Sequence, residues 1–393
     1  MKKIILLLVA LLTTAAVATA RDVEYENAVK SSKIVPSLSA ANQKKADAIY
    51  ESIRQQYQTH KISADDVVDK ALYHAVWSPQ LAARCLELVV PSGNKRAMAE
   101  LGYLYTHYTT AYMFKNKEAE GVKLLSDASK AGNKDATDYL GVYYHLKNQY
   151  DNAKTCFENA AHENNAVGTE IKGSMYADGH GYKKNLPKAR ELYRKAALMG
   201  DRNAMAKYAA SLKKNRFGGI NLPDAFFWMY IAADQGNDAS RSNLQLPLSG
   251  ERYGDDLHTL IARRSLASAN QWNKGAKITD DPIYRDGFIK GIKDRQIQAD
   301  NGDDWSCYYL GSMSYNGDFL KQDYNYVLHY YGKVLQSGKL PAPLLATVCE
   351  RMADLYRNGK GVQKDAAKAA EFDRMAAQLG SLNAYKRVEK IPE

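Results

Sequence analysis

Small and apolar residues recur along this chain at a spacing of 36. Small residues recur at Gly168, Ala204 and Ser240, where two successive copies begin and end, and the same frame returns toward the C-terminus from Ser306 and Val348. Within a copy, counting its first residue as zero, small residues at positions 21 and 28 flank a large apolar residue at position 24. This spacing places all three on one face of a helix. A fixed period in the thirties predicts an α-solenoid, a stack of helix pairs.

Polar residues and glycines mark where the helices of each copy begin and end. Position 17 carries Asn or Asp, which cap helices, and position 32 carries glycine, which ends them. The caps are Asn185, Asn221, Asp323 and Asp365, and the stops are Gly200, Gly236, Gly338 and Gly380. A glycine pair at positions 11 and 13 of the most regular copies suits a turn between two helices. Each copy is therefore predicted to be an antiparallel helix pair.

Looser copies and breaks in the frame set the predicted boundaries. Residues 79–244 form a first repeat block, and residues 303–393 form a second block with a C-terminal cap. Residues 245–302 leave the frame and are predicted to be an irregular helical connector or a decayed repeat. Upstream, residues 21–78 carry apolar residues at helical spacing and are predicted to be an N-terminal helical cap. The expected fold is all-α, with two solenoid blocks of stacked antiparallel helix pairs joined by an irregular helical segment.

Residues 1–20 are predicted to be a cleaved signal peptide. Two lysines precede an apolar run that ends near Leu12, and Ala18 and Ala20 supply the small residues of a cleavage site after Ala20. The apolar run is shorter than the ~20 residues that a membrane span needs, and no later segment is apolar enough to cross a bilayer. We therefore expect a periplasmic or secreted bacterial protein that does not span a membrane.

Charge and cysteine content refine this picture. The chain carries 54 Lys and Arg against 44 Asp and Glu, a formal net charge of +10. In an exported protein this excess favours acidic partners over nucleic acid. The four cysteines are Cys85, Cys156, Cys307 and Cys349. Because equivalent positions in stacked repeats lie too far apart for a bridge, we expect free thiols that pack as small apolar residues.

The frame resembles the Sel1-like repeat family, relatives of the tetratricopeptide repeat. The family's pattern A-x3-LG-x2-Y-x2-G-x-GV-x2-D-x2-KA-x2-WY-x2-AA-x2-G is nearly complete in residues 168–200 and 348–380, and the resemblance covers about residues 80–240 and 303–388. It implies an adaptor or scaffold. A cysteine-rich exported subfamily has been linked to penicillin binding and hydrolysis, but this chain lacks the paired cysteines of its repeats.

By resemblance to tetratricopeptide arrays, the first helices are expected to line a concave groove. Side chains at frame positions 2, 6, 9 and 10 would then face a protein, peptide or glycan ligand. The candidates are Tyr103, His107, Asp138, His145, Glu170, Asp178, Lys213, Lys214, Tyr308, Tyr315 and Arg357, with Trp305 just before its helix. The alternative is a solvated inner face that binds nothing.

The sequence contains no complete catalytic or metal-binding set. Ser211 and Lys214 fit the Ser-x-x-Lys motif of penicillin-binding enzymes, but the companion motifs Ser-Asp-Asn and Lys-Thr-Gly do not follow. His107 and His145 fall in adjacent repeats, yet there is no HExxH motif and zinc has little support. We therefore predict no catalytic residue, no metal and no cofactor.

The favoured function is an exported, non-enzymatic scaffold for protein–protein interaction, with a peptide or glycan as the other possible ligands. A cell-wall-directed, penicillin-binding or hydrolase-like protein is one alternative. A basic surface protein that binds anionic envelope polymers is the other, because the chain is basic overall.

Overall fold

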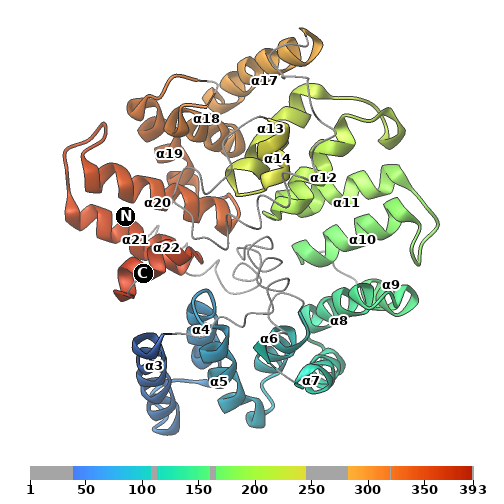
Figure 1. Cartoon of the computed structure of the whole chain (residues 1–393), viewed down its shortest axis with the longest axis vertical. Coiled ribbons are helices and arrows are strands. Elements are labelled where there is room, and N and C mark those ends of the chain that lie inside the picture. Colours follow the sequence, from blue (N-terminus) through green and yellow to red (C-terminus); the bar gives the residue numbers. More distant parts are fainter. Residues whose placement is uncertain are drawn as a thin grey trace. The chain divides into compact units, whose positions relative to one another are not determined.

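The computed structural model describes residues 39–107, 113–114, 116–159, 165–244, 282–318 and 320–391, with side chains for all of these except 282–289. This part of the chain is helical and contains no β-strand, and consecutive helices pack as antiparallel pairs (Figure 1). The predicted all-α fold of stacked helix pairs is therefore confirmed. The predicted signal peptide, residues 1–20, lies outside the described residues.

The described residues divide into two compact units. The N-terminal unit contains those up to Asn185 together with residues 389–391, and the C-terminal unit runs from Leu186 to Val388. This division falls between the two helices of one repeat, whereas the break in the frame suggested a boundary at 245–302. Residues on both sides of that break belong to the C-terminal unit.

The N-terminal unit is built from pairs of short helices. They are α3 (Ala40–Gln58), α4 (Ala64–Ala75), α5 (Pro79–Val89), α6 (Lys95–Thr106), α7 (Glu118–Lys130), α8 (Lys134–Leu146), α9 (Tyr150–Asn159) and α10 (Ala166–Asp178), with a 3₁₀ turn, η1 (Val90–Ser92). Helix α4 packs on α5, α6 on α7, and α8 on α9. The predicted N-terminal cap thus contains α3 and α4.

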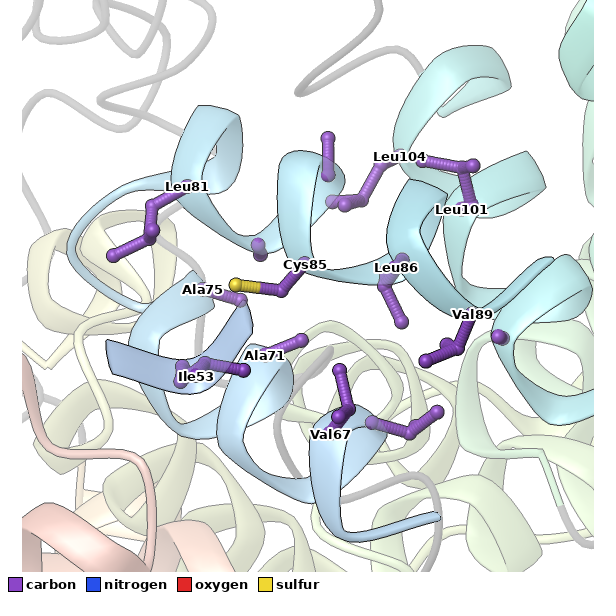
Figure 2. Close-up of a cluster of buried hydrophobic side chains, with 14 of the residues drawn as sticks. Ile53, Val67, Ala71, Ala75, Leu81, Cys85, Leu86, Val89, Leu101 and Leu104 are labelled. Atoms are coloured by element: carbon purple, nitrogen blue, oxygen red, sulfur yellow. The ribbon is translucent and has the colours of Figure 1, made fainter. Parts of the chain in front are cut away.

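A hydrophobic cluster joins α3, α4, α5 and α6 (Figure 2). Ile53, Val67, Leu86 and Leu101 are all at most 4% exposed there. Cys85 lies among them with a free, buried thiol, and burial raises the pKa of this thiol to about 12. The thiol therefore stays protonated at neutral pH and packs as an apolar group.

The C-terminal unit continues the same architecture. Its helices are α11 (Leu186–Leu198), α12 (Arg202–Leu212), α13 (Leu222–Asp234), α14 (Asp238–Asn243), α17 (Pro282–Asp300), α18 (Asp304–Asn316), α19 (Tyr324–Ser337), α20 (Ala342–Asn358), α21 (Ala366–Gln378) and α22 (Leu382–Glu389), with a 3₁₀ turn, η3 (Asn215–Phe217). Helix α17 packs against both α13 and α18. It therefore bridges the helices before and after the break in the frame. None of the described helices combines the length and apolarity needed to cross a membrane.

Three of the four predicted caps and all four stop glycines take their expected places. The side chains of Asn221, Asp323 and Asp365 accept hydrogen bonds from main-chain N–H groups in the first turns of α13, α19 and α21. The stop glycines have positive φ: +97° at Gly200, +88° at Gly236, +64° at Gly338 and +94° at Gly380. Residues with a Cβ rarely adopt this conformation. The position of each stop glycine therefore fixes where the second helix ends.

Candidate functional site

Several predicted groove residues in the body of the first helices are buried. Among the predicted groove residues, Tyr103 is 5% exposed, Asp138 4%, Glu170 8% and Tyr308 0%. His107, at the end of α6, is also buried, and its ring stacks on Tyr103 with a centroid distance of 4.4 Å. In the same unit Glu170 accepts a hydrogen bond of 2.9 Å from Ser174. These residues therefore lie inside the structure, away from solvent.

Tyr308 is buried beside an ion pair of the C-terminal unit. Arg351 of α20 donates to both carboxylate oxygens of Asp234 at the end of α13, at 2.7 and 3.1 Å. The Asp234 side chain is 0% exposed and that of Arg351 7%. Tyr308 of α18 donates its hydroxyl to the same carboxylate. Three helices thus meet at one buried charge, and Tyr308 faces it instead of a ligand.

Further polar side chains complete this buried network. Arg351 also donates to the hydroxyls of Ser312 and Tyr331, at 2.8 and 2.7 Å. Asn316 donates to Asp234 at 2.9 Å, and Gln235 donates to Tyr308 at 2.7 Å. The network links α13 to α18, α19 and α20, and so holds together helices on both sides of the break in the frame.

The electrostatics of the network follow from burial and pairing. Burial by itself would raise the pKa of Asp234, but the Arg351 charge and the hydrogen bonds from Arg351 and Tyr308 lower it to about 2. Tyr230 also belongs to the network, because its hydroxyl accepts a hydrogen bond of 3.2 Å from Asn316. Burial raises the pKa of Tyr308 and Tyr230 well above the ordinary value. At neutral pH the network therefore holds a charged carboxylate, a charged guanidinium and neutral tyrosines.

We expect Asp234 to make the C-terminal unit less stable as the pH falls below about 4. A carboxyl whose pKa falls from 3.8 to about 2 on folding stabilises the fold above pH 3.8, and this contribution is lost as the pH drops toward 2. The shift corresponds to roughly 2 kcal/mol. Urea unfolding of wild type and Asp234→Asn, from about pH 5 to about pH 2, measures it. The variant should start less stable and lose less on acidification, and equal losses would contradict the assignment.

The end of α6 is buried at His107, but the ends of the other first helices reach solvent. We call the residues in the last turn of these helices, or directly after it, the first-helix ends: His145, Leu146, Asp178, Lys213, Lys214, Tyr315, Asn316, Arg357 and Asn358. Leu146, Asp178, Lys214 and Asn358 are exposed, and the others are half-buried. These residues differ in charge and polarity from one repeat to the next.

The half-buried members of this set have partners within the fold. Tyr315 donates to Asp354 at 2.8 Å, and Arg357 pairs with Asp373 of α21. The His145 ring lies 5.6 Å from the ring of Tyr150. Trp305, expected beside the groove, is half-buried against Trp228, with centroids 4.9 Å apart. The Arg351 guanidinium carbon lies 5.0 Å from the centre of the Tyr315 ring, and Tyr308 shares the Asp234 carboxylate with Arg351. Trp305 makes a separate aromatic contact.

The Ser-x-x-Lys segment is not arranged for acyl transfer. Ser211 is 2% exposed, and its hydroxyl donates to the carbonyl of Tyr208 at 2.7 Å within the same helix. Lys214, in contrast, is exposed. A nucleophilic serine must be open to its substrate and bonded to its base. Among the described residues, no group of three or more His, Cys, Asp or Glu side chains is placed to hold a metal ion.

Comparison with known proteins shows repeats of the same kind. The sequence model of the Sel1 repeat matches residues 95–133, 167–201, 204–237, 306–334 and 347–381. A protective antigen of uropathogenic Escherichia coli with an SLR fold is 19% identical, with 87% of this chain and 82% of that chain covered and a TM-score of 0.39. A Sel1 repeat protein from Oxalobacter formigenes is 21% identical, with 64% and 86% covered and a TM-score of 0.27. No curated protein sequence matches the chain.

Proposed function

Because the chain belongs to the Sel1-repeat family, we propose that it is a non-enzymatic scaffold that binds protein partners through the first-helix ends. Sel1-repeat proteins are generally scaffolds for protein–protein interaction. We place the contact at the ends of the first helices because four predicted groove residues nearer the middle are buried: Tyr103, Asp138, Glu170 and Tyr308. A peptide or glycan ligand at the same residues is the alternative.

One observation carries this proposal: the repeats are alike inside and different at their exposed ends. The stop glycines and second-helix caps recur from copy to copy, whereas the exposed ends present Leu146, Asp178, Lys214 and Asn358. A solenoid needs constant residues for stacking, and it gains selectivity from residues that vary on an accessible surface. The variable ends are therefore the part of the chain suited to recognition.

Co-purification with mass spectrometry tests the proposal. The proposal includes export, which we infer from the signal-peptide pattern of residues 1–20. Partners are therefore sought in an envelope extract of the native cells. We expect wild type to retain specific partners, and Leu146→Ser/Asp178→Ser to lose at least one of them about tenfold, because single exposed contacts at an interface centre contribute about 1–2 kcal/mol each.

The matched control is Asp151→Ser/Leu382→Ser, which changes the same residue types at exposed positions on α9 and α22. This variant should keep every partner of the wild type. Equal partner profiles for wild type and the Leu146/Asp178 variant, with the fold intact by circular dichroism, would refute binding at these ends.

A further inference from the structure

Positive charge is concentrated in one part of the C-terminal unit. Residues 186–216, which span α11, α12 and the start of η3, contain nine Lys and Arg but only two acidic residues, so they carry +7 of the chain's formal +10. The basic residues are Lys188, Arg190, Arg194, Lys195, Arg202, Lys207, Lys213, Lys214 and Arg216. A local field of this size attracts acidic ligands more strongly than an even distribution of the same charge.

Arg190 binds the turn that carries several of these basic residues. Its guanidinium lies on α11 and donates to the main-chain carbonyl of Gly219 at 2.7 Å, and also to the carbonyl of Ser211. These bonds hold the turn after α12 against α11. Arg194, one helical turn further along α11, hydrogen-bonds to Tyr208 of α12. The turn that carries Lys213, Lys214 and Arg216 is thereby held next to the arginines of α11.

Four of these nine basic residues form no ion pair among the described residues. Within the described residues, Arg190, Arg194, Lys214 and Arg216 form no ion pair with a carboxylate, whereas Arg295 and Arg351 of the same unit each do. Burial and the neighbouring Lys214 charge lower the pKa of Lys213. The repulsion between the Lys213 and Lys214 charges is reduced when an anion binds beside them.

An exposed apolar side chain stands beside the cluster. Ile220 follows the glycines of the turn and is 59% exposed. It comes directly after Gly219, whose carbonyl Arg190 holds. A ligand that covers both features would gain apolar burial in addition to charge pairing.

We propose that this basic turn, defined as Arg190, Arg194, Lys213, Lys214, Arg216 and Ile220, binds an acidic segment of a protein partner that also presents an apolar side chain. The inference rests on the proposed scaffold function, because Lys213 and Lys214 belong to the first-helix ends. We choose an acidic protein segment because Sel1 repeats generally bind protein partners. A polyanion without apolar groups would leave Ile220 without a contact.

Fluorescence anisotropy of the full chain at low salt tests this. Two labelled probes are compared: a peptide of glutamates with leucine at every fourth position, and one of equal length made of glutamates only. We expect wild type to bind the leucine-containing peptide more tightly. Lys214→Glu/Arg216→Glu should weaken its binding roughly tenfold or more. Ile220→Ser should weaken binding of the leucine-containing peptide about threefold or more and leave the other unchanged.

The matched control is Lys339→Glu/Lys364→Glu, which makes the same charge change at exposed sites of the same unit. It should change the dissociation constant less than about twofold. Equal weakening by both double variants would show attraction by net charge and overturn the proposal. So would binding of wild type to vesicles containing phosphatidylglycerol without binding to either peptide, or binding to none of these probes.

Failure here is separable from failure of the scaffold function. If the peptides do not bind but co-purified partners still depend on Leu146 and Asp178, the scaffold function stands and the acidic-segment inference falls. If the co-purified partners do not depend on Leu146 and Asp178, the co-purification experiment itself refutes the scaffold function at the first-helix ends.

Discussion

Replacing Arg351 with alanine is expected to lower the free energy of unfolding by about 3–5 kcal/mol. The variant leaves the Asp234 carboxylate, with its side chain 0% exposed, without its guanidinium partner. It also removes the donor to the hydroxyls of Ser312 and Tyr331. An unpaired buried charge costs much more than the loss of a surface contact, because the lost pairing is not replaced by water.

Urea unfolding followed by circular dichroism measures this loss, with Arg374→Ala as the control. Arg374 lies on α21 and is exposed, so its removal should change stability by no more than about 0.5 kcal/mol. The double variant Asp234→Asn/Arg351→Met should lose less than Arg351→Ala alone, because it removes both charges together. A loss below about 1 kcal/mol for Arg351→Ala would mean that the pair is not buried as described.

Gly311→Ala is the second substitution for which we expect a large effect. A Cβ at Gly311 would lie 2.6 Å from Cε1 and 2.8 Å from Cδ1 of Tyr331. Tyr331 is 0% exposed and its hydroxyl accepts from Arg351, so its ring cannot move aside without disturbing the network. Overpacking of this kind should cost about 1–3 kcal/mol.

Gly332→Ala is the control, and we expect it to change the stability in the opposite direction. Gly332 lies on α19, one residue after Tyr331, and a Cβ there meets nothing within 4 Å. Alanine should therefore stabilise the helix by about 0.5–1 kcal/mol. Thermal melts should move in opposite directions for the two variants. A melting temperature that rises for Gly311→Ala would show that α18 and α19 do not pack this closely.

The regular part of the fold could be predicted because the cap and stop residues of each repeat act locally, within the repeat itself. Asn221 and Gly236 lie at the two ends of α13, as their frame positions indicate. The caps of the first helices were missed, although their signal was present. An Asn or Asp three residues before most copies accepts from the main chain of the first helix: Asn94, Asn133, Asn165, Asp201, Asn237 and Asp303. In several copies this residue follows the stop glycine directly.

The buried network could not be predicted in the same way. A repeat pattern encodes contacts between neighbouring helices, whereas Asp234 and Arg351 are 117 positions apart. Close approach between distant repeats also appears at Gly200, where an added Cβ would lie 2.7 Å from Pro341. Such contacts depend on how the repeats of this unit curve. Tyr308, expected to line an open face, is instead 0% exposed and bonded to Asp234.

Binding at the first-helix ends is tested most directly by photo-crosslinking in the native cells. Benzoylphenylalanine is placed at Leu146, Lys214 or Asn358, and at Asp151, Lys339 or Lys364 as exposed comparison positions. We predict partner adducts from at least one position of the first set and none from the second. Adducts only from the second set, or equal adducts from both, would contradict binding at the first-helix ends.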